Sequence, residues 1–116
     1  MPLDIEIKAS EEKVIIKFPV RFDMTVAENF RDAVRKFPKY VLNYELDMNN
    51  TEYMDAAALG SLMLLKYDKP EAINMDVTNC SKEILHLLML MNYDALFNIQ
   101  TDNSELHERD VAVHVA

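Results

Sequence analysis

The fold of this chain is decided by the stretch YELDMNNTEYMDAAALGSLMLL, which covers residues 44–65. Apolar and polar residues alternate at its start, and this alternation predicts a β-strand over residues 40–48. The residues that share the apolar face of this strand are Leu42, Tyr44, Leu46 and Met48. A polar loop follows, and the small and apolar residues 56–67 predict an α-helix. The order of strand, loop and helix indicates a unit of an α/β fold.

Asp55 is suited to N-cap this helix, because its carboxylate can accept hydrogen bonds from the first-turn amides and complements the positive end of the helix dipole. Helix propensity explains part of the alanine run that follows. It does not explain why residues 56–65 are small or apolar nearly all round. We expect this helix either to be buried on every side or to have a start that a partner covers.

The sequence before this stretch predicts a strand pair and a helix. Alternation over residues 3–7 and 14–22 predicts a hairpin, and Pro19 predicts that the second strand is bent or lies at an edge there. Thr25 and Glu28 have the spacing of a capping box, so a helix is expected to begin with them and to stop at Pro38. Its apolar stripe consists of Val26, Ala27, Phe30, Ala33, Val34 and Phe37.

The sequence after this stretch predicts another strand, a helix and a short last strand. The strands are expected at residues 73–78 and 96–100, and Ser81 or Asn79 is expected to cap the helix between them. The apolar stripe of that helix consists of Ile84, Leu87, Leu88 and Met91. We therefore expect an α/β fold: a mixed sheet of about five strands with an N-terminal antiparallel pair, and helices packed on the sheet.

We expect one domain over residues 1–101, followed by a C-terminal helix or flexible tail at residues 102–116. The tail ends in VAVHVA, whose alternation is compatible with a strand that pairs with a sheet edge or with a second protomer. A homodimer is therefore possible.

The composition excludes several classes of function. The formal net charge of −8 disfavours nucleic acid and anionic membranes as partners, because both are bound through lysine and arginine. The start of the chain does not resemble a secretory signal, and no apolar run reaches the roughly 18 residues of a membrane span, so a cytoplasmic protein is expected. One cysteine, Cys80, allows no internal disulfide and no CxxC pair.

No catalytic or cofactor motif is present. A single glycine cannot form a phosphate-binding glycine-rich loop, and the three histidines lack zinc-ligand spacing. No serine lies in a nucleophile motif, and Asp47 lacks the second acidic cluster that an aspartyl-phosphate receiver needs. We therefore expect no enzyme, no metal and no cofactor. The methionines in the strand and helix patterns are interpreted as core residues, and these are Met48, Met54, Met63, Met75, Met89 and Met91.

Two motifs resemble the STAS domain of bacterial anti-sigma factor antagonists. The family typically has a strand ending in Leu-Asp-Leu, a polar loop, an Asp-Ser-Ser/Thr-Gly-Leu-Gly motif and an apolar helix. The matching residues are Leu46, Asp47, Tyr53, Met54, Asp55, Leu59 and Gly60. A second landmark, an Asn-x-Ser loop before a helix and a Leu-Phe-x-Ile strand, matches Asn79, Ser81, Leu96, Phe97 and Ile99. The resemblance covers residues 3–101.

The resemblance implies a non-catalytic module that binds a regulatory protein, either a GHKL-type serine kinase that is an anti-sigma factor or a PP2C-type phosphatase. The residues it implicates in partner binding are Asn49, Asn50, Thr51, Asp55, Ala56, Ala57, Ala58, Leu59, Gly60 and Ser81. In this role Asp55 caps and orients the helix, the alanines permit close approach, and Leu59 and Leu62 support the helix from the core.

The chain departs from the family at the position of the switch. In partner-switching members the residue after the aspartate is a serine that the kinase phosphorylates, whereas here it is Ala56, followed by Ala57 and Ala58. We therefore expect a module that is not phosphorylated at the usual site, and a natural relative is favoured over an engineered phospho-null form. The alternative function is a sensor of a small molecule such as a nucleotide or lipid, which an apolar pocket near Met48 and Met75 would favour.

Overall fold

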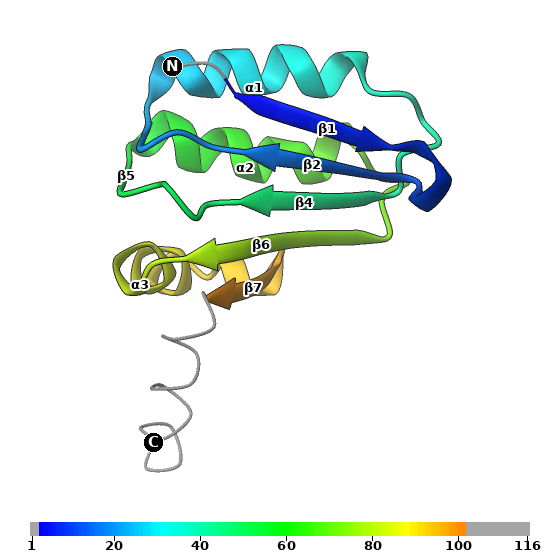
Figure 1. Cartoon of the computed structure of the whole chain (residues 1–116). Helices are drawn as coiled ribbons and strands as arrows, with labels where there is room; N and C mark the ends of the chain where they lie inside the picture. The colour runs from blue at the N-terminus through cyan, green and yellow to red at the C-terminus, as the bar shows by residue number, and fades with distance from the viewer. Residues whose placement is uncertain (1–2, 102–116) are drawn as a thin grey trace.

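The structure of the chain, a computed structural model, describes residues 3–101, which form a five-stranded sheet, a separate two-stranded sheet and helices. The strand order of the larger sheet is β1 (Asp4–Lys8), β2 (Lys13–Lys17), β4 (Asn43–Asp47), β6 (Asn74–Cys80) and β7 (Asn98–Thr101). Strand β1 is antiparallel to β2, and the other neighbours are parallel (Figure 1). The predicted α/β fold with an N-terminal antiparallel pair is confirmed. The prediction for the tail concerns residues 102–116, which lie outside the described residues.

The N-terminal hairpin forms where the sequence places it. β1 (Asp4–Lys8) and β2 (Lys13–Lys17) are joined by a 3-10 turn at Ala9–Glu11, and Glu12 closes the turn in the left-handed region with φ 53°. The chain bends at Pro19, as predicted, because proline cannot donate to the ladder. The residues after the bend form a separate short strand, β3 (Arg21–Phe22), which pairs in parallel with β5 (Tyr53–Met54).

Helix α1 (Met24–Lys36) begins one residue before the predicted capping box, so that prediction is wrong. Asp23 is the N-cap, because its carboxylate accepts a hydrogen bond from the amide of Val26 at 3.2 Å. Asp23 directly follows β3 and precedes the first helical residue, so it occupies the N-cap position and Thr25 lies inside the helix.

The remaining elements keep the predicted order. They are β4 (Asn43–Asp47), α2 (Ala56–Asp68), β6 (Asn74–Cys80), α3 (Lys82–Leu90), a 3-10 turn η2 (Tyr93–Ala95) and β7 (Asn98–Thr101). Ser81 rather than Asn79 caps α3, since its hydroxyl accepts from the amide of Ile84 at 3.2 Å. Met91, expected on the buried stripe of this helix, follows the helix and is exposed.

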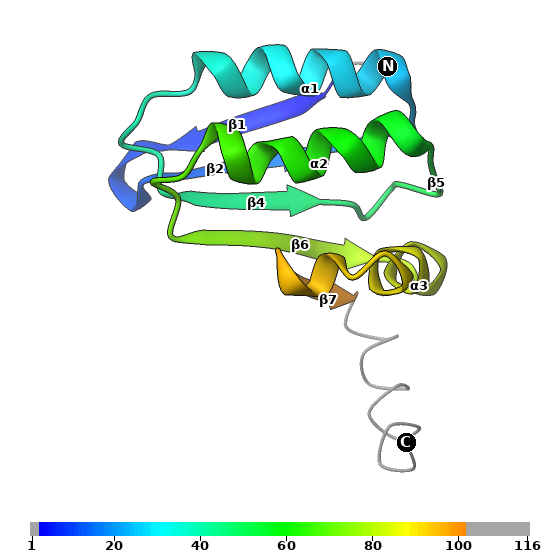
Figure 2. The ribbon, with the colours of Figure 1, turned by 180° about the vertical axis from the view of Figure 1, so that it is seen from behind.

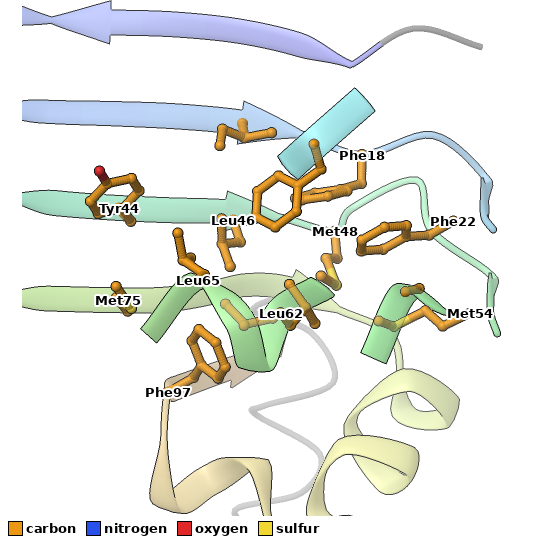
Figure 3. Packing of buried hydrophobic residues seen from close by; sticks show 14 of the residues in the cluster. Phe18, Phe22, Tyr44, Leu46, Met48, Met54, Leu62, Leu65, Met75 and Phe97 are labelled. Atoms are coloured by element: carbon orange, nitrogen blue, oxygen red, sulfur yellow. The ribbon is translucent and has the colours of Figure 1, made fainter. Parts of the chain in front are cut away.

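Helices α1 and α2 lie side by side on one face of the sheet (Figure 2). Between them and the sheet lies a single apolar core, in which Phe18, Met48 and Phe22 pack near the start of α2, and Leu62, Leu65 and Phe97 near its middle (Figure 3). The carboxyl ends of β2, β4 and β6 point to the end of the molecule where α2 and α3 begin (Figure 2).

Helix α2 is not buried on every side. Ala58, Leu62 and Leu65 are fully buried, whereas an exposed face carries apolar and small residues: Ala56, Gly60, Met63, Leu64 and Tyr67. The prediction that the six patterned methionines lie in the core is correct for Met48, Met54 and Met75 and wrong for the exposed Met63, Met89 and Met91. Helical spacing cannot reveal that a face has no neighbour.

Within residues 3–101, no helix combines the length and the apolar character that crossing a bilayer requires.

Candidate functional site

The carboxylate of Asp55 organises the start of two helices. Its Oδ1 accepts a hydrogen bond from the amide of Ala58 at 2.9 Å, which confirms it as the N-cap of α2. Its Oδ2 accepts from the amide of Met24, the first residue of α1, at 3.0 Å. The first turns of α1 and α2 are therefore held side by side by one side chain.

Pairing of β3 with β5 brings two distant loops together beside these helix starts. Glu52 and Tyr53 both donate their amides to the carbonyl of Val20, and Asp55 donates its amide to that of Phe22. The guanidinium carbon of Arg21 lies 4.1 Å from the centre of the Tyr53 ring, a cation–π contact. These contacts fix the loops on each other.

Four exposed residues of these loops and helix starts, Val20, Met24, Tyr53 and Ala56, form what we call the helix-start surface. Met24 is the most exposed of the three large residues, at 60%. The predicted site does not include Val20, Arg21, Met24 or Tyr53. Tyr53 stood in the matching motif, but the position of Met24 depends on the long-range bond to Asp55, which no local pattern signals.

The predicted partner-binding residues divide by exposure. Those on the surface are Asn49, Asn50, Ala56 and Gly60, those half-buried are Asp55, Ala57, Leu59 and Ser81, and those buried are Thr51 and Ala58. The structure thus brings the two predicted motifs to one end of the molecule, where α2 and α3 both begin (Figure 2).

Thr51 and Ala58 act inside the protein. Ala58 has no exposed surface, and Thr51 has 2%. The hydroxyl of Thr51 donates to the carbonyl of Pro19 at 3.0 Å, and this bond joins the polar loop to the bend between β2 and β3. Neither side chain touches solvent enough to meet a partner directly, so both support the surface from beneath.

Leu59 connects α2 to the segment after α3. Its carbonyl accepts a hydrogen bond from the hydroxyl of Tyr93 at 2.6 Å. Burial raises the pKa of the Tyr93 hydroxyl, so this donor stays protonated at neutral pH. The predicted supporting roles agree with this placement, since Leu62 is fully buried and Leu59 packs against the core.

A polar hollow of about 260 Å³ lies at the carboxyl ends of β2, β4 and β6. Its lining residues are Lys17, Phe18, Asp47, Asn49, Asn50 and Asn79. The Oδ1 of Asp47 accepts from the amide of Asn49 at 3.0 Å and from the side chain of Asn79 at 3.3 Å. An apolar pocket near Met48 and Met75 would have favoured a small-molecule sensor. Both side chains are instead buried in the core.

Two further groups have raised pKa values, and both lie on strands of the sheet, away from the helix starts. The carboxylate of Glu45, 2.9 Å from the Lys13 Nζ, raises the pKa of that ammonium through its hydrogen bond. Burial raises the pKa of Tyr44 to about 12. Among residues 3–101, no cluster of three or more His, Cys, Asp or Glu side chains could hold a metal ion.

The fold and this site define a small mixed-sheet α/β domain whose most elaborate feature is a pair of joined helix starts. The chain is 33% identical over 92 residues to a STAS-domain containing protein of Pseudomonas aeruginosa (strain UCBPP-PA14), a match that covers 78% of this chain and 91% of the relative. The chain belongs to the STAS-domain family. A scan of protein-family models returned no match.

Solved structures show the same fold. The anti-sigma factor antagonist SpoIIAA in its unphosphorylated form superimposes with a TM-score of 0.68 and 16% identity, over 95% of this chain and 96% of that one. The Bacillus cell fate determinant SpoIIAA in the phosphorylated form gives a TM-score of 0.67 and 14% identity, over 92% of this chain and 97% of that one.

Proposed function

We propose that this STAS-domain chain is a non-catalytic protein-binding module of the cytoplasm, which docks the helix-start surface and the outward face of α2 onto a regulatory protein. By analogy with anti-sigma factor antagonists, the partner is a GHKL-type serine kinase that is an anti-sigma factor, or a PP2C-type phosphatase. Asn49, Asn50 and the start of α3 at Ser81 flank this surface.

The observation that carries the proposal is Gly60. It is the only glycine of the chain, and it occupies the interior of α2, where glycine costs about 0.5–1 kcal/mol relative to alanine. Its φ is negative, and a Cβ built on it would meet no atom of another element within 4 Å in the described part of the chain. Within residues 3–101, neither the backbone nor the packing needs glycine there, which supports close approach of another molecule.

Ala56 is the residue on which the regulatory part of the proposal depends. It is the first residue of α2, is exposed, follows Asp55 directly and has no hydroxyl to accept phosphate. A phosphate here would place about −1.5 to −2 charges beside the Asp55 carboxylate and within an apolar surface. We infer that alanine keeps this surface permanently in its binding form.

The test is binding to the partner that the wild-type chain recovers from lysate of its source cells. Ala56→Glu should reduce that binding at least tenfold, because it adds charge and bulk at the centre of the surface. A glutamate in the first turn is favourable for the helix dipole, so the variant should remain folded. Ile73→Glu, also an exposed apolar residue but beyond the other end of α2, is the matched control and should bind normally. Equal binding of both variants and wild type would refute the proposal.

The alternative, a small-molecule sensor, receives less support. The hollow beside Asp47 is lined mainly by polar groups, with Phe18 as its one apolar lining residue, and its volume of about 260 Å³ lies below the roughly 300–1,000 Å³ of typical ligand pockets. A thermal-shift screen with nucleotides and lipids would revive this alternative if a hit were abolished by Asp47→Ala.

A further inference from the structure

Strand β1 forms one edge of the five-stranded sheet, and among residues 3–101 no strand pairs with its outer side (Figure 1). An unpaired strand edge presents amide and carbonyl groups to which another strand can bond. Two apolar side chains of β1 are also open to solvent, since Ile5 is 38% exposed and Ile7 is 44% exposed. This edge is therefore a candidate surface for pairing with a further strand.

The hydrogen bonds inside the sheet show which residues of β1 have outward-directed backbone groups. On β2, the amide of Phe18 donates to the carbonyl of Asp47 at 3.0 Å, so the even-numbered residues of β2 direct their backbone groups toward β4. The odd-numbered residues of β2 face β1, where they stand opposite the even-numbered residues and bond to them. The backbone groups of Ile5 and Ile7 therefore point away from the sheet.

The side chains of β1 divide between the two faces of the sheet. Ile5 and Ile7 stand opposite Ile16 and Val14, which are fully buried in the core, so both lie on the helical side. Helix α1 packs against α2 and leaves the two isoleucines exposed. The charged residues of the strand lie on the other face, and these are Asp4, Glu6 and Lys8.

We propose that β1 pairs antiparallel with β1 of a second copy of this chain, about a twofold axis at Glu6. This register sets Asp4 of each copy opposite Lys8 of the other, so that opposite charges meet twice. It also sets Ile5 opposite Ile7, and these are the residues whose backbone groups point outward. Their amides and carbonyls can then bond in pairs across the interface, while their side chains cover each other.

The charges and the length of the strand favour this register over its neighbours. An axis at Ile5 would set Asp4 opposite Glu6, and like charges directly opposite each other are destabilising. An axis at Ile7 would bring Ala9 into the ladder, although Ala9 belongs to the 3-10 turn. The axis at Glu6 uses the whole of β1 and leaves one pair of like charges, between the two copies of Glu6.

The size of this contact predicts a weak dimer. It joins the five residues of β1 on each side, fewer than the roughly 20–30 residues a side of a stable interface. Because the isoleucines of both copies lie on one face, the helices of both copies lie on that face too. The axis reverses the strand direction, so the two helix-start surfaces lie at opposite ends of the joined sheet. The inference is therefore separate from the proposed function.

The test exchanges the charges at positions 4 and 8 of the full chain and follows the mass by sedimentation over a range of protein concentrations. The wild-type mass should rise toward that of two copies. Asp4→Lys and Lys8→Asp each set like charges opposite each other, so each should weaken self-association at least tenfold. An equimolar mixture of the two variants should recover the dimer, because every charge then meets its opposite. This recovery also shows that both variants are folded.

The matched controls carry the same changes of net charge elsewhere. Glu83→Lys on α3 and Lys66→Asp on α2 alter exposed side chains away from β1, and each should self-associate like the wild type. Three results overturn the proposal: a wild type that stays monomeric at millimolar concentration, a dimer that the exchanges weaken no more than the controls do, and a mixture that stays monomeric. The first result includes the case in which another part of the same chain covers this edge.

Discussion

The carboxylate of Asp55 and the backbone amide of Met24 are joined by a 3.0 Å hydrogen bond across 31 residues of sequence. The same carboxylate caps its own helix through Ala58. Helix starts leave unpaired amides, and one aspartate here satisfies amides of two helices at once. Asp55 is therefore both a local cap and a tertiary link between α1 and α2.

Asp55→Ala should lower the free energy of unfolding by about 2–3 kcal/mol, more than the ~1 kcal/mol that is typical when a single cap is lost. Both the Ala58 amide and the Met24 amide lose their acceptor in this variant. Chemical denaturation followed by circular dichroism measures the change.

Two control variants sharpen this prediction. Asp23→Ala removes the side-chain cap of α1 alone and should cost about 1 kcal/mol. Asp55→Asn keeps only one oxygen acceptor, so one of the two amides loses its partner, and the variant should lose about 1 kcal/mol, less than Asp55→Ala. If Asp55→Ala costs no more than Asp23→Ala, the bond to Met24 contributes nothing to stability.

The sequence predicted those parts of the site that depend on local physics. Asp55 and Ser81 cap the helices they precede, because an acceptor placed before an apolar run satisfies the first-turn amides wherever the helix lies. The mixed sheet with an N-terminal antiparallel pair and parallel neighbours followed from the alternation of strands and helices and from the crossover rule.

The parts that the sequence did not predict depend on which elements become neighbours. The bond from Met24 to Asp55 and the Arg21 contact with Tyr53 exist because β3 pairs with β5, two short strands without their own periodicity. The all-round apolar character of α2 was compatible with full burial, and only the position of α1 on one side of it reveals the exposed face.

Ala56→Ser should restore the acceptor that the family resemblance places at this position. With the partner kinase and ATP, the serine variant should incorporate phosphate on α2 and then lose partner affinity. Ala57→Ser is the matched control, because Ala57 is half-buried and should be phosphorylated poorly. Intact-mass spectrometry and peptide mapping measure the modification. Equal phosphorylation of wild type and Ala56→Ser would show that the switch lies elsewhere.

Tyr44→Phe should leave stability at pH 7 unchanged or increase it by about 1–3 kcal/mol. Tyr44 is 1% exposed, and its hydroxyl is buried without a hydrogen-bond partner in the described part of the chain. Such a group carries its desolvation cost without a compensating bond. A denaturation experiment that shows a marked loss of stability instead would mean that the hydroxyl has a partner.

The raised pKa of Tyr44 also predicts how the stability of the protein changes at alkaline pH. Burial, together with the nearby charge of Glu71, raises the pKa of Tyr44 in the folded protein to about 12. The unfolded chain releases this proton near the usual pKa of about 10, so the wild type should lose stability as pH rises from about 10 to 12. Tyr44→Phe should show a smaller loss over this window, and identical pH profiles for the two proteins would contradict the assignment.

Gly60→Ala should raise the stability of the protein but weaken its binding to the partner. Alanine is the better helix former, and its methyl group would meet no atom of another element within 4 Å among residues 3–101, so the variant should be more stable by about 0.5–1 kcal/mol. If a partner lies against this face of α2, the same methyl should weaken its binding severalfold. Met63→Ala, one turn further along the exposed face, is the control for general loss of apolar contact and should not stabilise the protein. Thermal denaturation and titration calorimetry with the recovered partner measure the two effects. A variant that is both more stable and equally active in binding would show that glycine at this position has no role in docking.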